Sequence, residues 1–400
     1  MSDTRWTNEF LDQMRQVGDP VADGVIATVV DTDETTAVDK IMAHLIFNDD
    51  LVPENLPVGV REYLQQTAHL PAWADLAQIA VAQDLFLTYA PEIVLLLFYS
   101  SLPTAYAARK GAQVLAITRR LERGYIYRRI IETAQFIVDV MTPGAFEPQG
   151  QGIRAVQKVR LMHAAIRHYI QRDSRWQVHW DPDWGTPINQ EDMAGTLMTF
   201  SSIIMDGMRR FNIRLQPEQE EAYLHVWKVV GDMLSIRPEL LPSNMAEAHD
   251  LMDTILQRQW APSEAGHDLA SALIALLEGY VPRLLRGLPI SAMRYFRGDK
   301  VADMLGVGSA NWTTILLKLE NVFFGWARDL RNASRGFGRF ARWFHLMILD
   351  GVLSAERDGH RPPFRIPERL SVSTGLKPRK RRKPADKTRK PIPSSTPPVS

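Results

Sequence analysis

The sequence contains no cysteine among its 400 residues. This absence excludes disulfide bonds, iron–sulfur clusters, zinc–thiolate sites, a thiolate-ligated haem and a cysteine nucleophile. It also fits a reducing compartment, where disulfides rarely persist. The lack of cysteine therefore narrows the kinds of metal and redox site that the chain can build.

Long apolar runs and export signals are missing too. The first nine residues are mainly polar and lack the apolar stretch of a secretory signal. The longest run without a charged residue spans residues 93–108, which is too short for a membrane-spanning helix, and Pro103 interrupts it. We therefore expect a soluble, cytoplasmic protein without a transmembrane segment.

The motifs of several common enzyme classes are also absent. The sequence has no phosphate-binding loop, no dinucleotide-binding glycine pattern, no His-Glu-x-x-His zinc motif and no nucleophile elbow. It lacks convincing strand signals and internal repeats, whereas apolar residues recur at helical spacing along nearly the whole chain. With 45% hydrophobic residues to form a core, we predict an all-α fold, a single globular multi-helix domain over residues 1–370.

The helical pattern breaks at residues that favour helix ends. Gly-Asp-Pro at residues 18–20 ends the first helix, and Thr-Pro-Gly at residues 142–144 ends a later one. Asn189 with Asp192 is typical of a capped helix start. Helices are expected at residues 4–17, 21–31, 36–48, 57–68, 74–90, 92–101, 105–122, 125–141, 152–172, 190–213, 217–235, 245–258, 264–284, 298–305, 309–329 and 337–354.

The last part of the chain differs from the rest. Residues 377–391 carry nine lysines or arginines and one aspartate, so this segment has a net charge of +8 and the remainder −7. Charge and proline with little apolar content predict that residues 371–400 form a disordered basic tail. The tail could bind nucleic acid or anionic lipid, or it could serve only solubility. For the folded body we expect no nucleic-acid binding.

One histidine, His163, lies in the middle of an apolar helical stripe. At about 100° per residue, it shares a helix face with the set Val156, Val159, Ile166 and Ile170. Arg160 and Arg167 fall at one edge of that face. This layout suits a planar cofactor with an apolar body, two carboxylates and a central metal, with the imidazole as metal ligand. The alternative is a buried structural histidine beside arginines that are solvated or paired with a neighbouring helix.

A second constellation lies on the preceding helix. Arg129, Thr133, Phe136 and Val140 share one face, and Glu132 lies at its edge. An arginine and a threonine at the head of an apolar face are not well explained by exposure to solvent. These side chains are therefore candidates for the lining of a site.

Six short segments form an ordered set over about three quarters of the chain. They are Gly-Asp-Pro-Val-Ala-Asp (18–23), Ser-Leu-Pro-Thr-Ala-Tyr-Ala (101–107), Arg-Ile-Ile-Glu-Thr (129–133), Lys-Val-Arg-Leu-Met-His-Ala-Ala-Ile-Arg-His (158–168), Gly-Thr-Pro-Ile-Asn-Gln-Glu-Asp-Met-Ala-Gly-Thr-Leu-Met-Thr-Phe-Ser (185–201) and Arg-Gly-Asp-Lys-Val-Ala-Asp-Met-Leu-Gly (297–306). Each segment is weak alone, but six in one order are not expected by chance. Together they resemble the family of the latex-clearing (rubber) oxygenases and the fungal MpaB-type oxygenases.

The resemblance implies a b-type haem (heme b, an iron cofactor) with His163 as its proximal ligand. With such a haem, the guanidinium forks of Arg160 and Arg167 suit its propionates, and a salt bridge to a neighbouring helix is the alternative for each. The expected activity is an oxygenase reaction in which O2 cleaves a small apolar alkene, possibly isoprenoid, as the substrate. The rival interpretation is a non-catalytic helical protein that binds an apolar ligand or a protein partner.

The chain departs from the family pattern at two positions. The resemblance implies that Arg129 and Thr133 line the haem pocket, with a lysine beside the threonine that can reach the open side of the iron. Glu132 stands in place of that lysine. The family's proposed catalytic glutamate, counted back without gaps, falls on Gln113, whose amide cannot act as a base. A gap could move this role elsewhere, Glu132 could take it, or the chain could use different chemistry.

Overall fold

The computed structural model describes residues 5–32, 45, 47–119, 125–279 and 283–309. Within these ranges the chain forms helices and loops but no strand, and the isolated bridge there joins Ala108 to Trp260. The predicted all-α fold class is therefore confirmed. The expected helices at 36–48, 309–329 and 337–354 and the tail 371–400 lie wholly or mostly outside the described residues.

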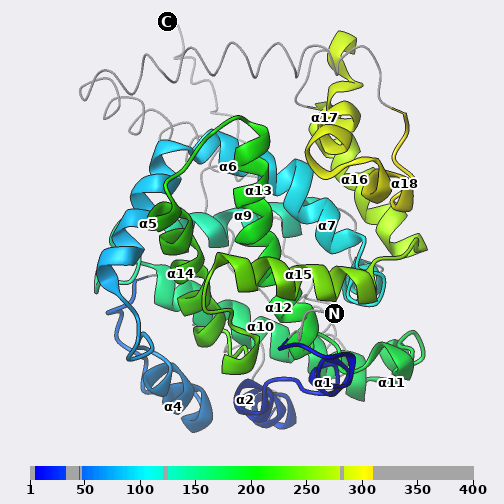
Figure 1. The fold of residues 1–400 in the computed structure, drawn as a ribbon. Coiled ribbons are helices and arrows are strands. Elements are labelled where there is room, and N and C mark those ends of the chain that lie inside the picture. The colour runs from blue at the N-terminus through cyan, green and yellow to red at the C-terminus, as the bar shows by residue number, and fades with distance from the viewer. Residues whose placement is uncertain (1–4, 33–44, 46, 120–124, 280–282, 310–400) are drawn as a thin grey trace, which may run out of the picture.

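Figure 1 shows how the helices are arranged in the order of the chain. The first are α1 (Asn8–Met14), α2 (Pro20–Asp31), α4 (Val58–Gln66), α5 (Leu76–Thr88), α6 (Ala90–Leu96), α7 (Leu102–Tyr106) and α8 (Ala112–Arg119). Next come α9 (Tyr125–Met141), α10 (Gly152–Arg172), α11 (Ser174–Gln177), α12 (Gln190–Phe200) and α13 (Ser202–Arg210). The last are α14 (Pro217–Met233), α15 (Met245–Gln259), α16 (Glu264–Gly279), α17 (Leu288–Arg297) and α18 (Asp299–Met304).

The predicted break at residues 18–20 and the predicted capped helix start at Asn189 are confirmed. Pro20 opens α2, and the side chain of Asp19 accepts a hydrogen bond from the backbone N–H of Ala22. The side chain of Asn189 accepts from the N–H of Asp192 at the start of α12. These local signals give correct boundaries because each cap bonds within its own turn.

The helix predictions are wrong at three places: two expected helices are divided and one helix was not predicted. The expected helix at 105–122 is interrupted, because Ala108 pairs with Trp260 between α7 and α8. The expected helix at 190–213 divides at Ser201, whose hydroxyl donates to the carbonyl of Leu197 and competes with the backbone ladder. No helix was predicted over α17, where Pro289 lies in the first turn and is compatible with a helix start.

A π-helical turn, Leu97–Ser101, joins α6 to α7. Pro103 in the first turn of α7 has no N–H and its ring crowds the carbonyl four residues earlier, so a regular ladder cannot pass through it. Residues 76–88 and 90–106 meet at 86°. Among the described residues no single helix is long and apolar enough to cross a membrane, and only this bent pair passes that test together, by length and composition.

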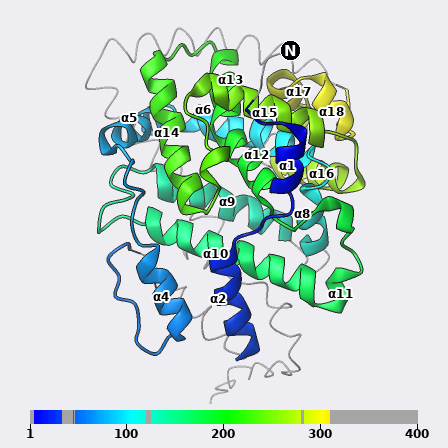
Figure 2. The same ribbon diagram turned by 60° about the horizontal axis from the view of Figure 1, so that its bottom comes forward.

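Helix α10 is buried on two sides (Figure 2). It crosses the molecule with α2 and α4 on one side and α9 and α12 on the other. Its first apolar face joins the main hydrophobic core through Val156, Val159, Met162, Ile166 and Ile170. Its second face joins a smaller core with α2 and α4 through Leu161, Ala164, Ala165 and Tyr169. The predicted apolar stripe around His163 is therefore the inner face of α10.

Candidate functional site

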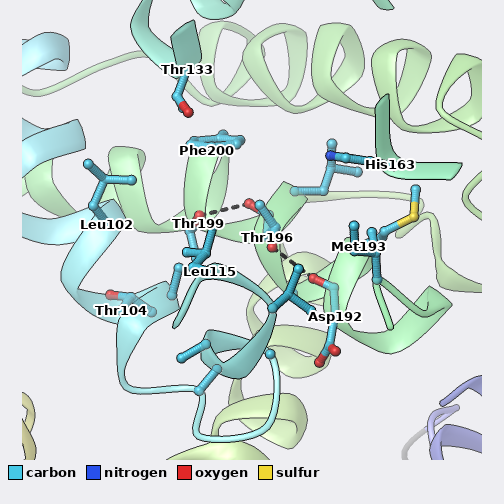
Figure 3. Close-up of a pocket in the computed structure, with 18 of the residues that line it drawn as sticks. Leu102, Thr104, Leu115, Thr133, His163, Asp192, Met193, Thr196, Thr199 and Phe200 are labelled. Atoms are coloured by element: carbon cyan, nitrogen blue, oxygen red, sulfur yellow. Dashed lines mark hydrogen bonds between the residues drawn. The ribbon is translucent and has the colours of Figure 1, made fainter. Parts of the chain in front are cut away.

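A cavity of about 250 Å³ lies against the inner face of α10. Its walls come from α7, α8, α9, α12, α14 and α15 as well as α10, and most of the lining side chains are apolar. In Figure 3 the side chains of Leu102, Thr133, His163 and Thr196, which come from four different helices, surround one space. The cavity thus gathers residues that are far apart in the sequence.

His163 lines this cavity from the middle of α10. Its Nδ1 is fully enclosed and has no hydrogen-bond partner among the described residues. The side chain as a whole keeps partial exposure, and because it lies on the cavity wall that exposure is to the cavity. An imidazole without a structural bond is available to a ligand.

The imidazole of His163 is neutral over the physiological pH range. Burial, together with the positive charges of Arg129 and Arg167, lowers its pKa from 6.5 to about 3. A neutral imidazole keeps the lone pair that a metal ligand needs.

This pKa predicts an acid-sensitive fold in the ligand-free protein. The unfolded chain takes up a proton at His163 near pH 6.5, whereas the folded chain does so only near pH 3. Between these values acid favours unfolding, and the free energy of unfolding should fall by up to about 1.4 kcal/mol per pH unit from this group. Urea titrations between about pH 7 and 5 should show a shallower pH dependence for His163→Gln than for the wild type. Equal pH dependence would contradict the assignment.

Helix α9 contributes to the cavity the three polar residues that the sequence singled out there. Arg129, Glu132 and Thr133 line the cavity. Arg129 Nη1 lies 3.5 Å from Glu132 Oε2, so a cation and a carboxylate are paired on the wall. Gln113 does not line the cavity, and its amide donates to the carbonyl of Arg109. Of the two positions weighed for an acid or base, the structure brings only Glu132 to the cavity.

The five threonines of the cavity wall add less polarity than their number suggests. Each hydroxyl donates to a backbone carbonyl of its own helical segment, at 2.6 to 2.8 Å. These threonines are Thr104, Thr118, Thr133, Thr196 and Thr199. Two of the bonds involve α12 and are drawn in Figure 3. Because the donors are used internally, the wall is suited to an apolar molecule that needs few hydrogen bonds.

Arg160 and Arg167 do not line the cavity. Nε and Nη2 of Arg160 donate to the two oxygens of Asp19, at 2.5 and 2.9 Å. Nε of Arg167 donates to both oxygens of Asp23 at 3.1 Å. This geometry favours the alternative of ion pairs with a neighbouring helix over propionate binding, because both guanidiniums are held by α2.

A buried charge network behind the cavity was missed by the sequence reasoning. Glu191 is fully buried and accepts bonds from Arg15, Arg258 and Gln259, at 3.2, 2.9 and 3.1 Å. Arg15 also bonds Asp192, whose side chain lines the cavity. In the sequence the acidic pair at the start of α12 is explained by capping alone, and only the fold brings the two arginines to it.

The loop before α12 supplies a strained residue to the cavity wall. Ile188 has φ of 51°, a left-handed conformation that a β-branched residue rarely adopts. Its side chain lines the cavity and its carbonyl accepts a bond from Nη1 of Arg167 at 3.3 Å. Strain of this kind tends to occur at functional sites, where the surrounding contacts hold it.

Comparisons with known proteins relate the whole site to one family. A sequence model described as "ER-bound oxygenase mpaB/B'/Rubber oxygenase, catalytic domain" matches residues 59–343. A rubber oxygenase of Streptomyces sp. (strain K30) is 28% identical over 298 residues, which are 73% of this chain and 71% of that protein. A solved structure of a latex clearing protein in the closed state has a TM-score of 0.70 at 23% identity, and covers 88% of this chain and 95% of that one. The range matched by the family model includes every residue that lines the cavity.

Proposed function

Because this chain belongs to the mpaB/rubber oxygenase catalytic-domain family, we propose that it is a haem-dependent oxygenase that cleaves an apolar alkene with molecular oxygen. The observation that carries this proposal is the imidazole of His163. It is neutral, has no partner for Nδ1 among the described residues, and faces an apolar cavity. A neutral imidazole on the wall of an apolar cavity has the lone pair and the surroundings expected of a haem ligand.

The residues present fit a b-type haem. His163 would ligate the iron, the aliphatic side chains of α10 and α12 would pack against the macrocycle, and Arg129 would offer a guanidinium to its carboxylates. When bound, the haem would supply the redox-active iron on which oxygen chemistry depends. The protein supplies the ligand, the orientation of the substrate and the exclusion of water.

Glu132 is the group we assign to proton handling. Its side chain is buried, lines the cavity and is paired with Arg129. A carboxylate on the wall of an apolar cavity is within reach of a bound substrate and is a group that can transfer a proton. In this assignment Glu132 takes the place of the carboxylate that Gln113 cannot provide.

The lining also favours an unsaturated, apolar substrate of isoprenoid type. The threonine hydroxyls are bonded to their own helices, so a hydrocarbon can pack against their methyl groups without leaving donors unpaired.

We further propose that the protein acts in the cytoplasm.

The proposed activity can be tested with a matched pair of hydrocarbons. The haem-loaded protein is incubated with squalene, an isoprenoid alkene, or with squalane, its saturated counterpart. We expect oxygen uptake and carbonyl products with squalene only, because cleavage needs the double bond. Haem binding without uptake for squalene or any shorter isoprenoid alkene would instead favour the non-catalytic interpretation.

Replacing Glu132 by glutamine should keep the haem but slow turnover by on the order of 10²-fold, because the amide cannot transfer a proton. Glu132→Lys should shift the ferric spectrum toward a six-coordinate, nitrogen-ligated form if the side chain reaches the iron. Asp139→Asn is the control, since Asp139 is on the same helix but does not line the cavity. Turnover of Glu132→Gln equal to the wild type would remove Glu132 from the mechanism.

A further inference from the structure

Two carboxylates of α2 hold α10 on either side of His163. Asp19 binds Arg160, three residues before the histidine, and Asp23 binds Arg167, four residues after it. Asp19 lies in the turn that opens α2, and Asp23 lies one turn further along the same helix. The two ion pairs therefore bracket the histidine along the axis of α10.

Three of the four side chains in these pairs are buried, and Asp23 is partly exposed. The side chain of Asp19 is 2% exposed and that of Arg160 10% exposed. The side chain of Arg167 is 2% exposed, whereas Asp23 keeps 35%. Charge-assisted bonds in such surroundings have fixed geometry, above all where one carboxylate accepts two N–H groups of a guanidinium, as in the Asp19–Arg160 pair.

Apolar packing alone does not fix the rotation of α10. This helix has one apolar face toward the cavity and another toward α2 and α4, where Ala164 and Ala165 belong to the smaller core. Directional bonds to α4 are made six residues before His163, where the Gln157 side chain donates to the carbonyl of Leu64 and the hydroxyl of Thr67. Hydrophobic contacts are non-directional, so they would tolerate a rotation or a shift of the helix. Ion pairs on either side of His163 can add specificity to the Gln157 bonds, because both pairs must be satisfied at the same time.

The second pair also reaches the cavity wall. Arg167 donates through Nη1 to the carbonyl of Ile188, the strained residue in the loop before α12. The contact chain from Asp23 through Arg167 therefore joins α2, α10 and this loop. A change at Asp23 would be transmitted to two walls of the cavity.

We propose that Asp19 and Asp23 are positioning residues, which fix the rotation of α10 and so direct the imidazole of His163 into the cavity. They act through Arg160 and Arg167, whose guanidiniums they hold away from the cavity although both are within one turn of His163. This proposal rests on the proposed haem site for its functional meaning. Both aspartates precede the residues matched by the family model.

The first test uses the haem-free protein. The ring signals of His163 are observed by NMR and assigned by their loss in His163→Gln. We expect the signals to move in Asp19→Asn and Asp23→Asn and to stay in place in Asp31→Asn. Asp31 ends the same helix and is a matched control, because among the described residues it makes no hydrogen bond or ion pair with α10 and its charge acts there on His168, five residues from His163. Asp23→Glu, which keeps the charge, should restore most of the wild-type signal.

The second test is haem titration of the same variants. We expect the affinity of Asp19→Asn and Asp23→Asn to fall by about 10- to 100-fold, the usual effect of removing a group that orients a metal ligand. Asp31→Asn should bind like the wild type. Folding of each variant is checked by its cooperative thermal transition.

The proposal is overturned if folded Asp19→Asn and Asp23→Asn keep both the wild-type ring signals and the wild-type haem affinity. If Asp19→Asn does not fold, Asp23→Asn decides, because Asp23 is partly exposed and its loss is better tolerated. If the wild type binds no haem, the proposed function fails, but the ring signals of His163 still decide whether the aspartates position it.

Discussion

Replacing His163 by alanine should abolish stoichiometric haem binding and the Soret band that reports it. His163 is the imidazole that lines the cavity among the described residues, and the lining there offers no other nitrogen ligand of this kind. Without cysteine, the chain also has no thiolate to replace it. We therefore expect the loss to be complete rather than partial.

His168→Ala is the matched control for this experiment. His168 lies five residues further along α10, does not line the cavity and packs edge-on against Tyr169. This variant should keep the Soret band. Free imidazole added to His163→Ala should restore part of the band, because it can occupy the space of the missing ring. A full-strength band in His163→Ala without added imidazole would rule out this ligand.

Replacing Glu191 by leucine should destabilise the protein by roughly 3–5 kcal/mol, the usual result of breaking a buried ion pair on one side. Glu191 is fully buried and binds two guanidiniums, Arg15 and Arg258. Leucine has a similar volume but no acceptor, so both cations would lose their buried partner. The substitution should also change the position of Asp192 on the cavity wall, because Arg15 binds both Glu191 and Asp192.

Urea unfolding at neutral pH measures this effect, with Asp12→Asn as control. Asp12 binds the same Arg258 at 2.5 Å, but its side chain is 69% exposed. A solvent-exposed pair contributes little, so this variant should lose less than about 1 kcal/mol. If Glu191→Leu lost no more than Asp12→Asn, the network would not be a main source of stability.

The sequence predicted those features of the site that depend on a single helix. Periodicity placed His163 on an apolar face of α10 and Arg129 with Thr133 on a face of α9, and the structure brings all three to one cavity. Helix spacing determines which residues share a face, whatever lies opposite. The cap at Asn189 was predictable for the same reason, because its bonding partner is only three residues away.

Tertiary structure alone decided what lies opposite each of those faces. Arg160 and Arg167 have the spacing of propionate ligands, but they bind aspartates 141 and 144 residues earlier in the chain, which spacing on α10 could not reveal. The position of Glu191 in the first turn of α12 likewise indicates only a helix start. Its partners Arg15 and Arg258 lie far before and far after it in the sequence, so the sequence does not reveal them. A buried charged side chain pairs with the opposite charge that the fold places beside it, because leaving it unpaired has a high free-energy cost. The sequence by itself therefore determined the helices and the faces they present, and the packing of distant helices determined which of those polar groups are paired and which one, His163, is left to a ligand.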